Sequence, residues 1–203
     1  MNVSEALQTR VSSNNFDAEA TLSGDEITAL VALAQEAPSS FNIQFTRFVA
    51  VTDTATKQRL MAAAWNQPKI GAAAAVFVLT GSLKAHEAYA VRMRAAAAAG
   101  EVPADVMERM VGMATQAYSN PVRAREESLR SVGLSGMSLM LAAQERGLAS
   151  CPMIGFDPTA FSEILWLDAD HPPLMVIVVG RAAAGNSPRK PRLAPADVLR
   201  IVG

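Results

Sequence analysis

The sequence has almost no cysteine and no surplus of positive charge. Among its 203 residues there is one cysteine, Cys151, so no disulfide can form within the chain. Such usage is typical of proteins in a reducing compartment. The 18 Lys and Arg residues are balanced by 19 Asp and Glu residues, which gives a formal net charge of -1 at pH 7. Nucleic acid and anionic membranes attract basic proteins, so we expect neither as a partner.

Long hydrophobic runs are absent as well. The longest apolar stretch, GAAAAVFVLTG (71–81), is too short to cross a bilayer. The first ten residues, MNVSEALQTR, contain no apolar signal core. We therefore predict a soluble, cytoplasmic protein without a membrane segment.

Recognisable catalytic and metal-binding motifs are missing too. The only histidines are His86 and His171, and we interpret both as surface residues because neither lies near a plausible nucleophile in the sequence. No HExxH or paired CxxC motif occurs, which predicts no metal site. No P-loop motif occurs and no strand is followed by GxGxxG, so neither common nucleotide site is indicated. Cys151 is interpreted as a small buried residue.

The chain does have enough apolar residues for a folded core. Half of them are hydrophobic and 18% are charged, and no internal linker is visible, so we predict a single domain over residues 1–203. Spacing, caps and breakers predict helices over 21–38, 54–65, 84–119 with a break at Gly100 and Pro103, 125–146, 158–167 and 194–203. Strands are predicted over 47–52, 72–81, 149–156 and 172–180. This order predicts an α+β fold.

The long helix predicted over 125–146 carries two glycines on its apolar stripe. Gly133 and Gly136 each lower helix stability by about 1 kcal/mol relative to alanine. We expect a second helix or a ligand to pack closely against this stripe.

Four polar clusters interrupt the predicted elements. Their sequences are TRVSSNNFD (9–17), PSSFNIQ (38–44), WNQPKIG (65–71) and PRKPRLAP (188–195). Arg10, Lys190 and Arg192 are cations that suit a phosphate group, because charge-assisted hydrogen bonds can satisfy its oxygens. The amides, hydroxyls and lysine of the other two clusters suit a planar heterocycle such as a flavin. Each cluster alone is equally compatible with an ordinary turn or solvated loop.

Taken together and in this order, the clusters resemble the nitroreductase family of FMN-dependent oxidoreductases. PSSFNIQ is similar to the signature loop of the family, and GLSGMSLMLAAQERGLAS (133–150) to its long central helix. CPMIGFDP (151–158) and KPRL (190–193) resemble two further family segments. The resemblance runs from about Val3 to Val202 and is weakest over 84–124. It implies a nitroreductase-like α+β fold: a central, mostly antiparallel sheet flanked by helices, in an interlocked homodimer.

The resemblance also implies how FMN is bound at two sites in the dimer interface. Arg10, Ser12, Lys190 and Arg192 would approach the phosphate, and Asn14, Asn66 and Lys69 the flavin pyrimidine. Pro38, Ser39, Ser40 and Asn42 would also contact FMN, the first three from the partner chain. In the segment that begins at Pro152, the backbone N–H groups of Ile154 and Gly155 would face flavin N5 and O4. The glycine stripe would lie in the dimer interface, with close packing inside one chain as the alternative.

Two positions depart from the family pattern. Asn14 stands where the family has a second cation near the pyrimidine, which predicts a somewhat lower reduction potential with Lys69 as the remaining cation. Phe45 stands where the family usually has proline, which predicts a less rigid turn beside the pocket.

The function implied is an FMN-dependent oxidoreductase that uses NADH or NADPH in a ping-pong reaction. Flavin N5 would carry the hydride, so no catalytic side chain is expected, and the acceptors would be nitroaromatics, quinones or related electrophiles. The helices over 84–119 would shape the substrate slot. Three alternatives stay open: a non-catalytic FMN-binding or flavin-sensing protein, a specialised flavin enzyme that dehalogenates, dehydrogenates or fragments flavin, and a helical interaction protein without a cofactor.

Overall fold

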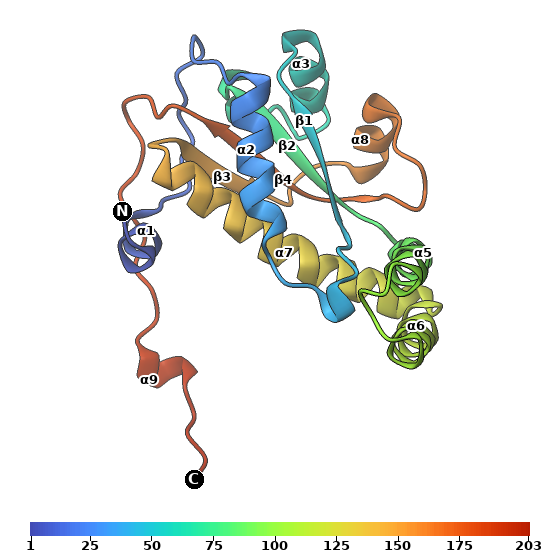
Figure 1. The fold of residues 1–203 in the computed structure, drawn as a ribbon. Coiled ribbons are helices and arrows are strands. Elements are labelled where there is room, and N and C mark those ends of the chain that lie inside the picture. The colour runs from blue at the N-terminus through green and yellow to red at the C-terminus, as the bar shows by residue number, and fades with distance from the viewer.

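Four antiparallel strands form the centre of the protein. The computed structural model describes residues 1–203 and contains β1 (Thr46–Val51), β2 (Ala75–Gly81), β3 (Ala149–Met153) and β4 (Pro173–Gly180) (Figure 1). Their order in the sheet is β1-β2-β4-β3, and all three neighbouring pairs are antiparallel. The predicted α+β class and the predicted antiparallel sheet are confirmed.

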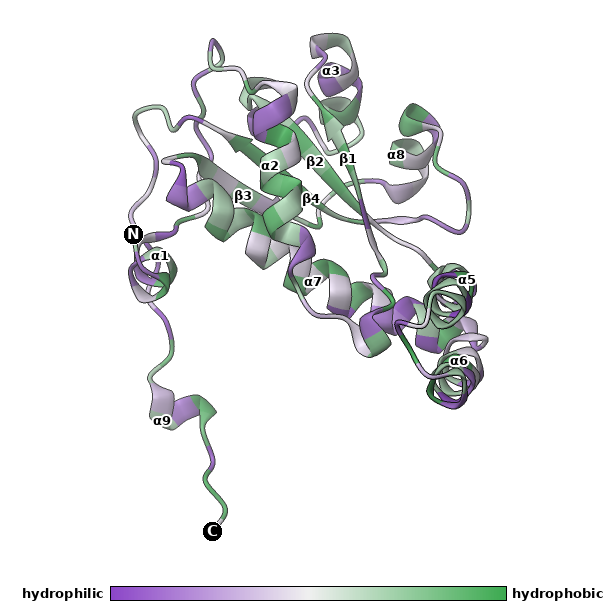
Figure 2. Ribbon diagram, in the orientation of Figure 1, coloured by the Kyte–Doolittle hydropathy of each residue, from purple (hydrophilic) through white to green (hydrophobic).

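Helices cover both faces of this sheet. On one face of the sheet, Leu30 and Leu139 of the helices pack with Phe77 and Ile177 of the strands. On the other face, Leu60 and Phe161 pack with strand residues that include Val76 and Val178. Every residue of β2 is buried, which explains why its sequence is a continuous apolar run without alternation. Figure 2 shows the hydrophobic residues concentrated on β1, β2 and β4.

The nine helices agree with the prediction in their main features. Their bounds are α1 Val3–Thr9, α2 Gly24–Gln35, α3 Thr54–Ala62, α4 Pro68–Ala72, α5 Ala85–Ala98, α6 Ala104–Tyr118, α7 Pro121–Glu145, α8 Pro158–Leu165 and α9 Pro195–Val198. None of them combines the length and the apolar character needed to cross a bilayer.

Two helices were missed by the prediction, and two others differ from it in extent. The sequence analysis missed α1, although Asn2 and Glu5 form a capping box at its start, and it missed the short α4. Helix α7 begins at Pro121 rather than Arg125, because the side chain of Asn120 accepts hydrogen bonds from the first free N–H groups. The predicted terminal helix over 194–203 is reduced to α9.

The two glycines of α7 lie on different faces of that helix. A Cβ atom at Gly136 would lie 3.1 Å from Sδ of Met175 and 3.2 Å from Cδ1 of Ile177, so this glycine lets α7 approach the sheet of its own chain. A Cβ atom at Gly133 would meet nothing within 4 Å. Packing inside one chain therefore explains Gly136, and the expectation of an interface remains for Gly133.

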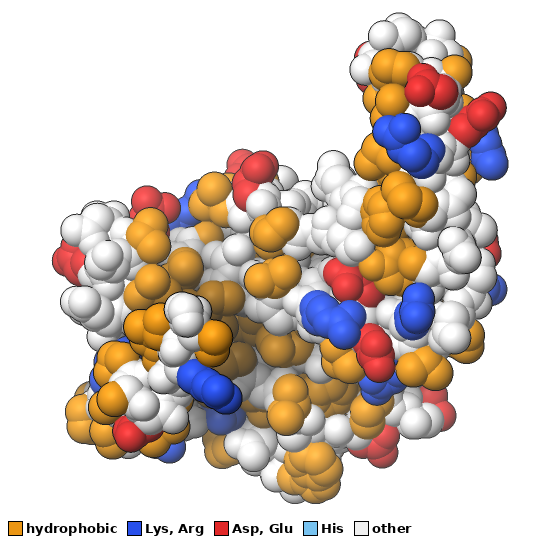
Figure 3. Space-filling model, turned by 90° about the horizontal axis from the view of Figure 1, so that it is seen from below, with side chains coloured by type: hydrophobic (Ala, Val, Ile, Leu, Met, Phe, Trp, Pro, Cys, Tyr) orange, Lys and Arg blue, Asp and Glu red, His pale blue; other side chains and the backbone are white.

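Helices α5 and α6 pair into an arm that stands off the body of the protein (Figures 1 and 3). Its base is a small core in which Ile43, Phe45 and Tyr118 are buried. His86 lies near this base and is only 8% exposed, so its interpretation as a surface residue was wrong. The reason is that the start of α5 packs against the end of α6. Cys151 is buried and unpaired, as predicted.

Candidate functional site

A cavity of about 300 Å³ opens between the N-terminal segment, α4 and the loop that follows β4. Its lining includes Arg10, Ser12, Asn14, Lys69, Lys190 and Arg192. The structure thus brings together six of the predicted site residues, from three distant parts of the chain. Arg189 also lines the cavity, which gives it five cationic side chains and no carboxylate. We refer to it as the cationic cavity.

The cations of this cavity are not neutralised within the chain. The Nη1 atom of Arg10 is buried and has no hydrogen-bond partner. Burial lowers the pKa of Arg10 below its ordinary value, and the positive charges of Arg192 and Arg189 lower it further. Arg192 donates only to backbone carbonyl groups, those of Lys190 at 2.9 Å and Pro191 at 3.3 Å. A buried cation without a partner is unfavourable, so the site is complementary to an anion with several acceptor oxygens.

Backbone hydrogen bonds build the cavity from segments that are far apart in the sequence. The N–H group of Ser13 donates to the carbonyl of Ser150 at the edge of the sheet, at 3.0 Å. The Oδ1 atom of Asn186 accepts from the N–H groups of both Asn14 and Asn15, at 2.7 and 2.9 Å. The N-terminal segment is therefore fixed both to β3 and to the loop that carries the phosphate candidates.

Lys69 and Asn14 are in direct contact at the edge of the cavity. Nζ of Lys69 donates to Oδ1 of Asn14 at 2.9 Å, and the side chain of Asn14 makes no other hydrogen bond. Asn66, the other candidate near the pyrimidine, does not line the cavity. It has a left-handed backbone with φ 55°, and its N–H group donates to the carbonyl of Met61 at 2.9 Å.

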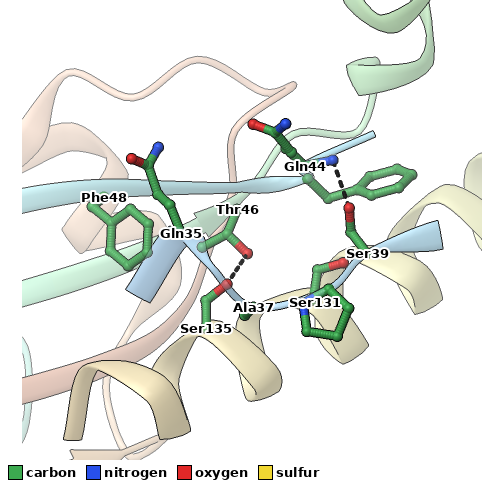
Figure 4. A pocket seen from close by; sticks show the side chains of 10 residues that line it. Gln35, Ala37, Ser39, Gln44, Thr46, Phe48, Ser131 and Ser135 are labelled. Atoms are coloured by element: carbon green, nitrogen blue, oxygen red, sulfur yellow. Dashed lines mark hydrogen bonds between the residues drawn. The ribbon is translucent and has the colours of Figure 1, made fainter. Parts of the chain in front are cut away.

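The predicted signature loop lies away from the cationic cavity. Its residues Pro38 and Ser39 border a separate hollow of about 20 Å³ between β1 and α7 (Figure 4). None of Pro38, Ser39, Ser40 and Asn42 lines the cationic cavity. Within one chain, the structure therefore divides the predicted site residues into separate groups.

Hydrogen bonds hold this loop in a strained conformation. Phe41, Asn42 and Gln44 have positive φ angles of 53°, 56° and 62°. Residues other than glycine rarely adopt such backbone angles. Figure 4 shows the N–H group of Gln44 donating to Oγ of Ser39, at 2.8 Å. The hydroxyl of Tyr118 donates to Oγ of Ser40 at 2.6 Å.

Aromatic packing holds the residue that follows this loop. Phe45 is fully buried, and its ring meets that of Tyr118 edge to face with 5.0 Å between centroids. Arg92 of α5 donates to the carbonyl of Ile43 at 3.0 Å. The arm formed by α5 and α6 thus contacts the loop from outside, and the lower rigidity of the turn stays a prediction.

The segment after β3 has backbone N–H groups without a partner, those of Ile154 and Gly155. Pro152 lies within β3 and is partly buried, whereas Ile154 is 79% exposed. A Cβ atom at Gly155 would lie 3.1 Å from the indole ring of Trp65, so the glycine lets this ring pack closely against the chain. The N–H group of Asp157 donates to the carbonyl of Ala63 at 2.9 Å, which ties the segment to the end of α3. Trp65 and Gly155 are thus neighbours.

The sequence profile of the Nitroreductase family matches residues 7–181. The chain belongs to the nitroreductase family. YodC of Bacillus subtilis (strain 168), which is named as an NAD(P)H nitroreductase, is 30% identical over 181 residues, or 89% of this chain and 90% of that protein. The resemblance inferred from the sequence is confirmed, and with it the prediction of an oxidoreductase.

Solved structures of nitroreductases have the same fold. The ydfN protein of Bacillus subtilis superimposes with a TM-score of 0.93 at 29% identity and covers 98% of each chain. A protein of Exiguobacterium sibiricum, solved in complex with FMN, has a TM-score of 0.89 at 27% identity and covers 100% of this chain and 98% of its own. The predicted nitroreductase-like fold is confirmed.

Three residues at the cavity of this nitroreductase were not among the predicted ones. Arg189 and Ser187 line the cavity, and Asn186 fixes its two main segments. Arg189 lies in the basic cluster 188–195 that the sequence analysis had singled out, and Ser187 directly precedes that cluster, so the cluster was a usable signal for both. The side chain of Asn186 accepts from the backbone N–H groups of residues 14 and 15, and no local sequence pattern predicts such a contact.

Proposed function

We propose that the protein is an FMN-dependent oxidoreductase that takes reducing equivalents from NADH or NADPH and passes them to nitroaromatics, quinones or related electrophiles. The observation that carries the proposal is the cationic cavity, in which the buried Nη1 atom of Arg10 lacks a partner and no carboxylate is present. A phosphate monoester supplies the negative charge and the acceptor oxygens that this cavity lacks. Family membership and the FMN-bound neighbour support the same cofactor.

The residues of the cavity fit the two ends of FMN. Arg10, Ser12, Lys190 and Arg192 would hold the phosphate, because they offer two guanidinium groups, an ammonium group and a hydroxyl. Asn14 and Lys69 lie on the same cavity and would face the flavin. They are therefore suited to a group that becomes electron-rich on reduction.

The segment around residue 154 would cover the reactive edge of the flavin. The N–H groups of Ile154 and Gly155 make no hydrogen bond within the chain, so they are free to donate to N5 and O4 without help from a side chain. Asn66 follows Trp65, whose ring lies beside Gly155, and Pro152 precedes the segment. We propose that these four residues complete the flavin site on its pyrimidine side.

We propose that Pro38, Ser39, Ser40 and Asn42 reach the cofactor from the second subunit of a homodimer. Their distance from the cationic cavity within one chain supports this arrangement. Large apolar side chains are also exposed on α1, on α7 and on the C-terminal tail, including Leu7, Leu134, Leu199, Ile201 and Val202. Figure 3 shows hydrophobic side chains gathered around a hollow on the underside of the molecule. A second copy of the chain would cover such a surface.

When bound, FMN supplies the redox chemistry, because its N5 accepts a hydride from reduced nicotinamide and the reduced flavin then gives two electrons to the acceptor. The chain's own residues bind the cofactor and set the charge around it. Protons can come from solvent, which agrees with the absence of an acid–base pair in the cavity. The arm formed by α5 and α6 would border the substrate slot.

The test is a visible absorption spectrum of the purified protein, followed by anaerobic addition of NADH or NADPH. We expect flavin bands that bleach on reduction and return when a quinone or a nitroaromatic is added. Bands that do not bleach would instead identify a flavin-storing or flavin-sensing protein. A protein that binds no FMN even after incubation with the cofactor would refute the proposal.

A further inference from the structure

We propose that Asn14 is a positioning residue that fixes the ammonium group of Lys69 at the cationic cavity without neutralising it. The inference rests on the proposed function, because the anionic group that would use this charge belongs to bound FMN. It concerns a position at which this chain departs from the cation typical of its family.

The geometry assigns each atom of the contact. Oδ1 of Asn14 accepts from Nζ of Lys69 at 2.9 Å. The backbone of Asn14 is itself fixed, because its N–H group donates to Oδ1 of Asn186 at 2.7 Å. Asn186 is in turn held by its own amide group, which donates to the carbonyl groups of Asn15 and Ala183 at 2.8 and 3.0 Å. The acceptor for Lys69 is therefore placed by a chain of neutral amides.

At this position a neutral acceptor can direct the ammonium group of Lys69 without cancelling its charge, which neither an anion nor a cation could do. A carboxylate so close to Nζ would form an ion pair and cancel most of the positive charge seen from the cavity. A second cation would repel the ammonium group and turn it away. The amide oxygen directs the ammonium group and leaves its full charge, since an amide carries a dipole but no net charge.

No other charged group on the cavity attracts the ammonium group of Lys69. The remaining charged side chains that line it are Arg10, Arg189, Lys190 and Arg192, and all are positive. Without Asn14 the flexible lysine side chain would be free to move into solvent, away from these cations. The contact thus keeps a fifth positive charge in a region that repels it.

A flavin that gains negative charge on reduction should report this contact. The readout is the ratio of the dissociation constants of oxidised and reduced FMN, obtained from the two-electron potentials of bound and free cofactor. We expect Asn14→Asp to lower this ratio about tenfold, equivalent to a potential lower by about 30 mV. Asn14→Ala should lower it about threefold, because the charge remains but is no longer fixed.

The neighbouring residue offers a matched control. Asn15 has the same side chain, and its backbone N–H group bonds to the same Asn186 atom at 2.9 Å, but its side chain makes no hydrogen bond. Asn15→Ala should leave the ratio unchanged. A general disturbance of the segment would move both alanine variants alike and would overturn the inference.

A double-mutant cycle with Lys69→Met tests whether Asn14 acts through the lysine. We expect Asn14→Ala to change the ratio in the wild-type background and to change it no further once Lys69 is replaced. An equal effect in both backgrounds would mean that Asn14 acts on the flavin directly, which overturns the positioning role. A wild-type protein that binds no FMN overturns the proposed function itself, whereas FMN binding with an unaltered ratio in Asn14→Asp overturns only this inference.

Discussion

The cationic cavity and the loop of residues 38–44 differ in how each is held and in what each lacks. The cavity is assembled from both ends of the chain and lacks a counter-charge for its cations. The loop is neutral and strained, and its hydrogen bonds run within the loop (Figure 4) and to side chains that include those of Tyr118, Arg92 and Glu127. The comparison teaches that the two halves of the proposed site are separate within one chain. The charged half lines the cationic cavity, whereas the loop that supplies the other hydroxyls and amides does not line it.

The largest expected effect concerns the charged half. Replacing both Lys190 and Arg192 by alanine should weaken FMN binding about a hundredfold or more, because two charge-assisted hydrogen bonds of roughly 1.5–3 kcal/mol each are lost. Riboflavin, which has no phosphate, should lose little affinity. Titration of both flavins checks this, with Lys84→Ala as a control because Lys84 pairs with Asp170 on the surface at 2.8 Å. Equal weakening of both flavins would contradict the phosphate assignment.

The next effect concerns the packing that holds the loop. Phe45→Ala removes a fully buried ring and should lower the free energy of unfolding by about 3–5 kcal/mol. The folded variant should still prefer FMN to riboflavin, because the phosphate residues lie elsewhere. Urea unfolding and flavin titration together check the two statements. Loss of the preference in the folded variant would show that the two regions are coupled within one chain.

Mixing two defective variants tests whether the halves meet between subunits. One variant carries Lys190→Ala with Arg192→Ala, and the other carries Ser39→Ala with Ser40→Ala. After unfolding and joint refolding, about one quarter of all sites should combine an intact cavity with an intact loop if dimers form at random. NADH oxidation should then recover to about that fraction. No recovery would mean that each site is built from one chain.

The smallest expected effect is that of a single hydroxyl. Tyr118→Phe removes the hydrogen bond to Ser40 and should lower the free energy of unfolding by about 0.5–1.5 kcal/mol. Tyr89 provides the matched control, since its hydroxyl is buried without a partner, so Tyr89→Phe should be neutral or stabilising. Urea unfolding of both variants checks the difference. A larger loss in Tyr89→Phe would contradict the assignment of the hydrogen bond.

Most of the fold could be predicted because its signals are local. The capping box of Ser23 and Glu26 marks α2, and the continuous apolar runs mark β2 and β4. Helix α1 has an equally good capping box but is so short that its apolar periodicity is weak. His86 was misplaced because the charged residues around it suggested a solvent-facing helix, whereas the packing of α5 on α6 buries it.

The candidate site was predictable only in part. Arg10, Lys190 and Arg192 are side chains of a recognisable type, and the structure gathers them at one cavity. The contact between Lys69 and Asn14 depends on where the N-terminal segment lies, and a hydrogen bond to residue 186 decides that. Such contacts depend on the tertiary fold, so they cannot be predicted from the neighbouring residues in the sequence.

Because the cavity joins the two ends of the chain, it can form only late in folding. Strand β4 lies between β2 and β3, and the loop with Lys190 and Arg192 follows it, so a growing chain on the ribosome lacks the complete cavity until this loop has been made. Cofactor loading is then a step that follows synthesis, and bound FMN stabilises the folded state in proportion to RT ln(1 + [FMN]/Kd). In a cell short of riboflavin, more of the newly made chain would remain unliganded and open to proteolysis. The supply of a vitamin would thus help to set the amount of this protein.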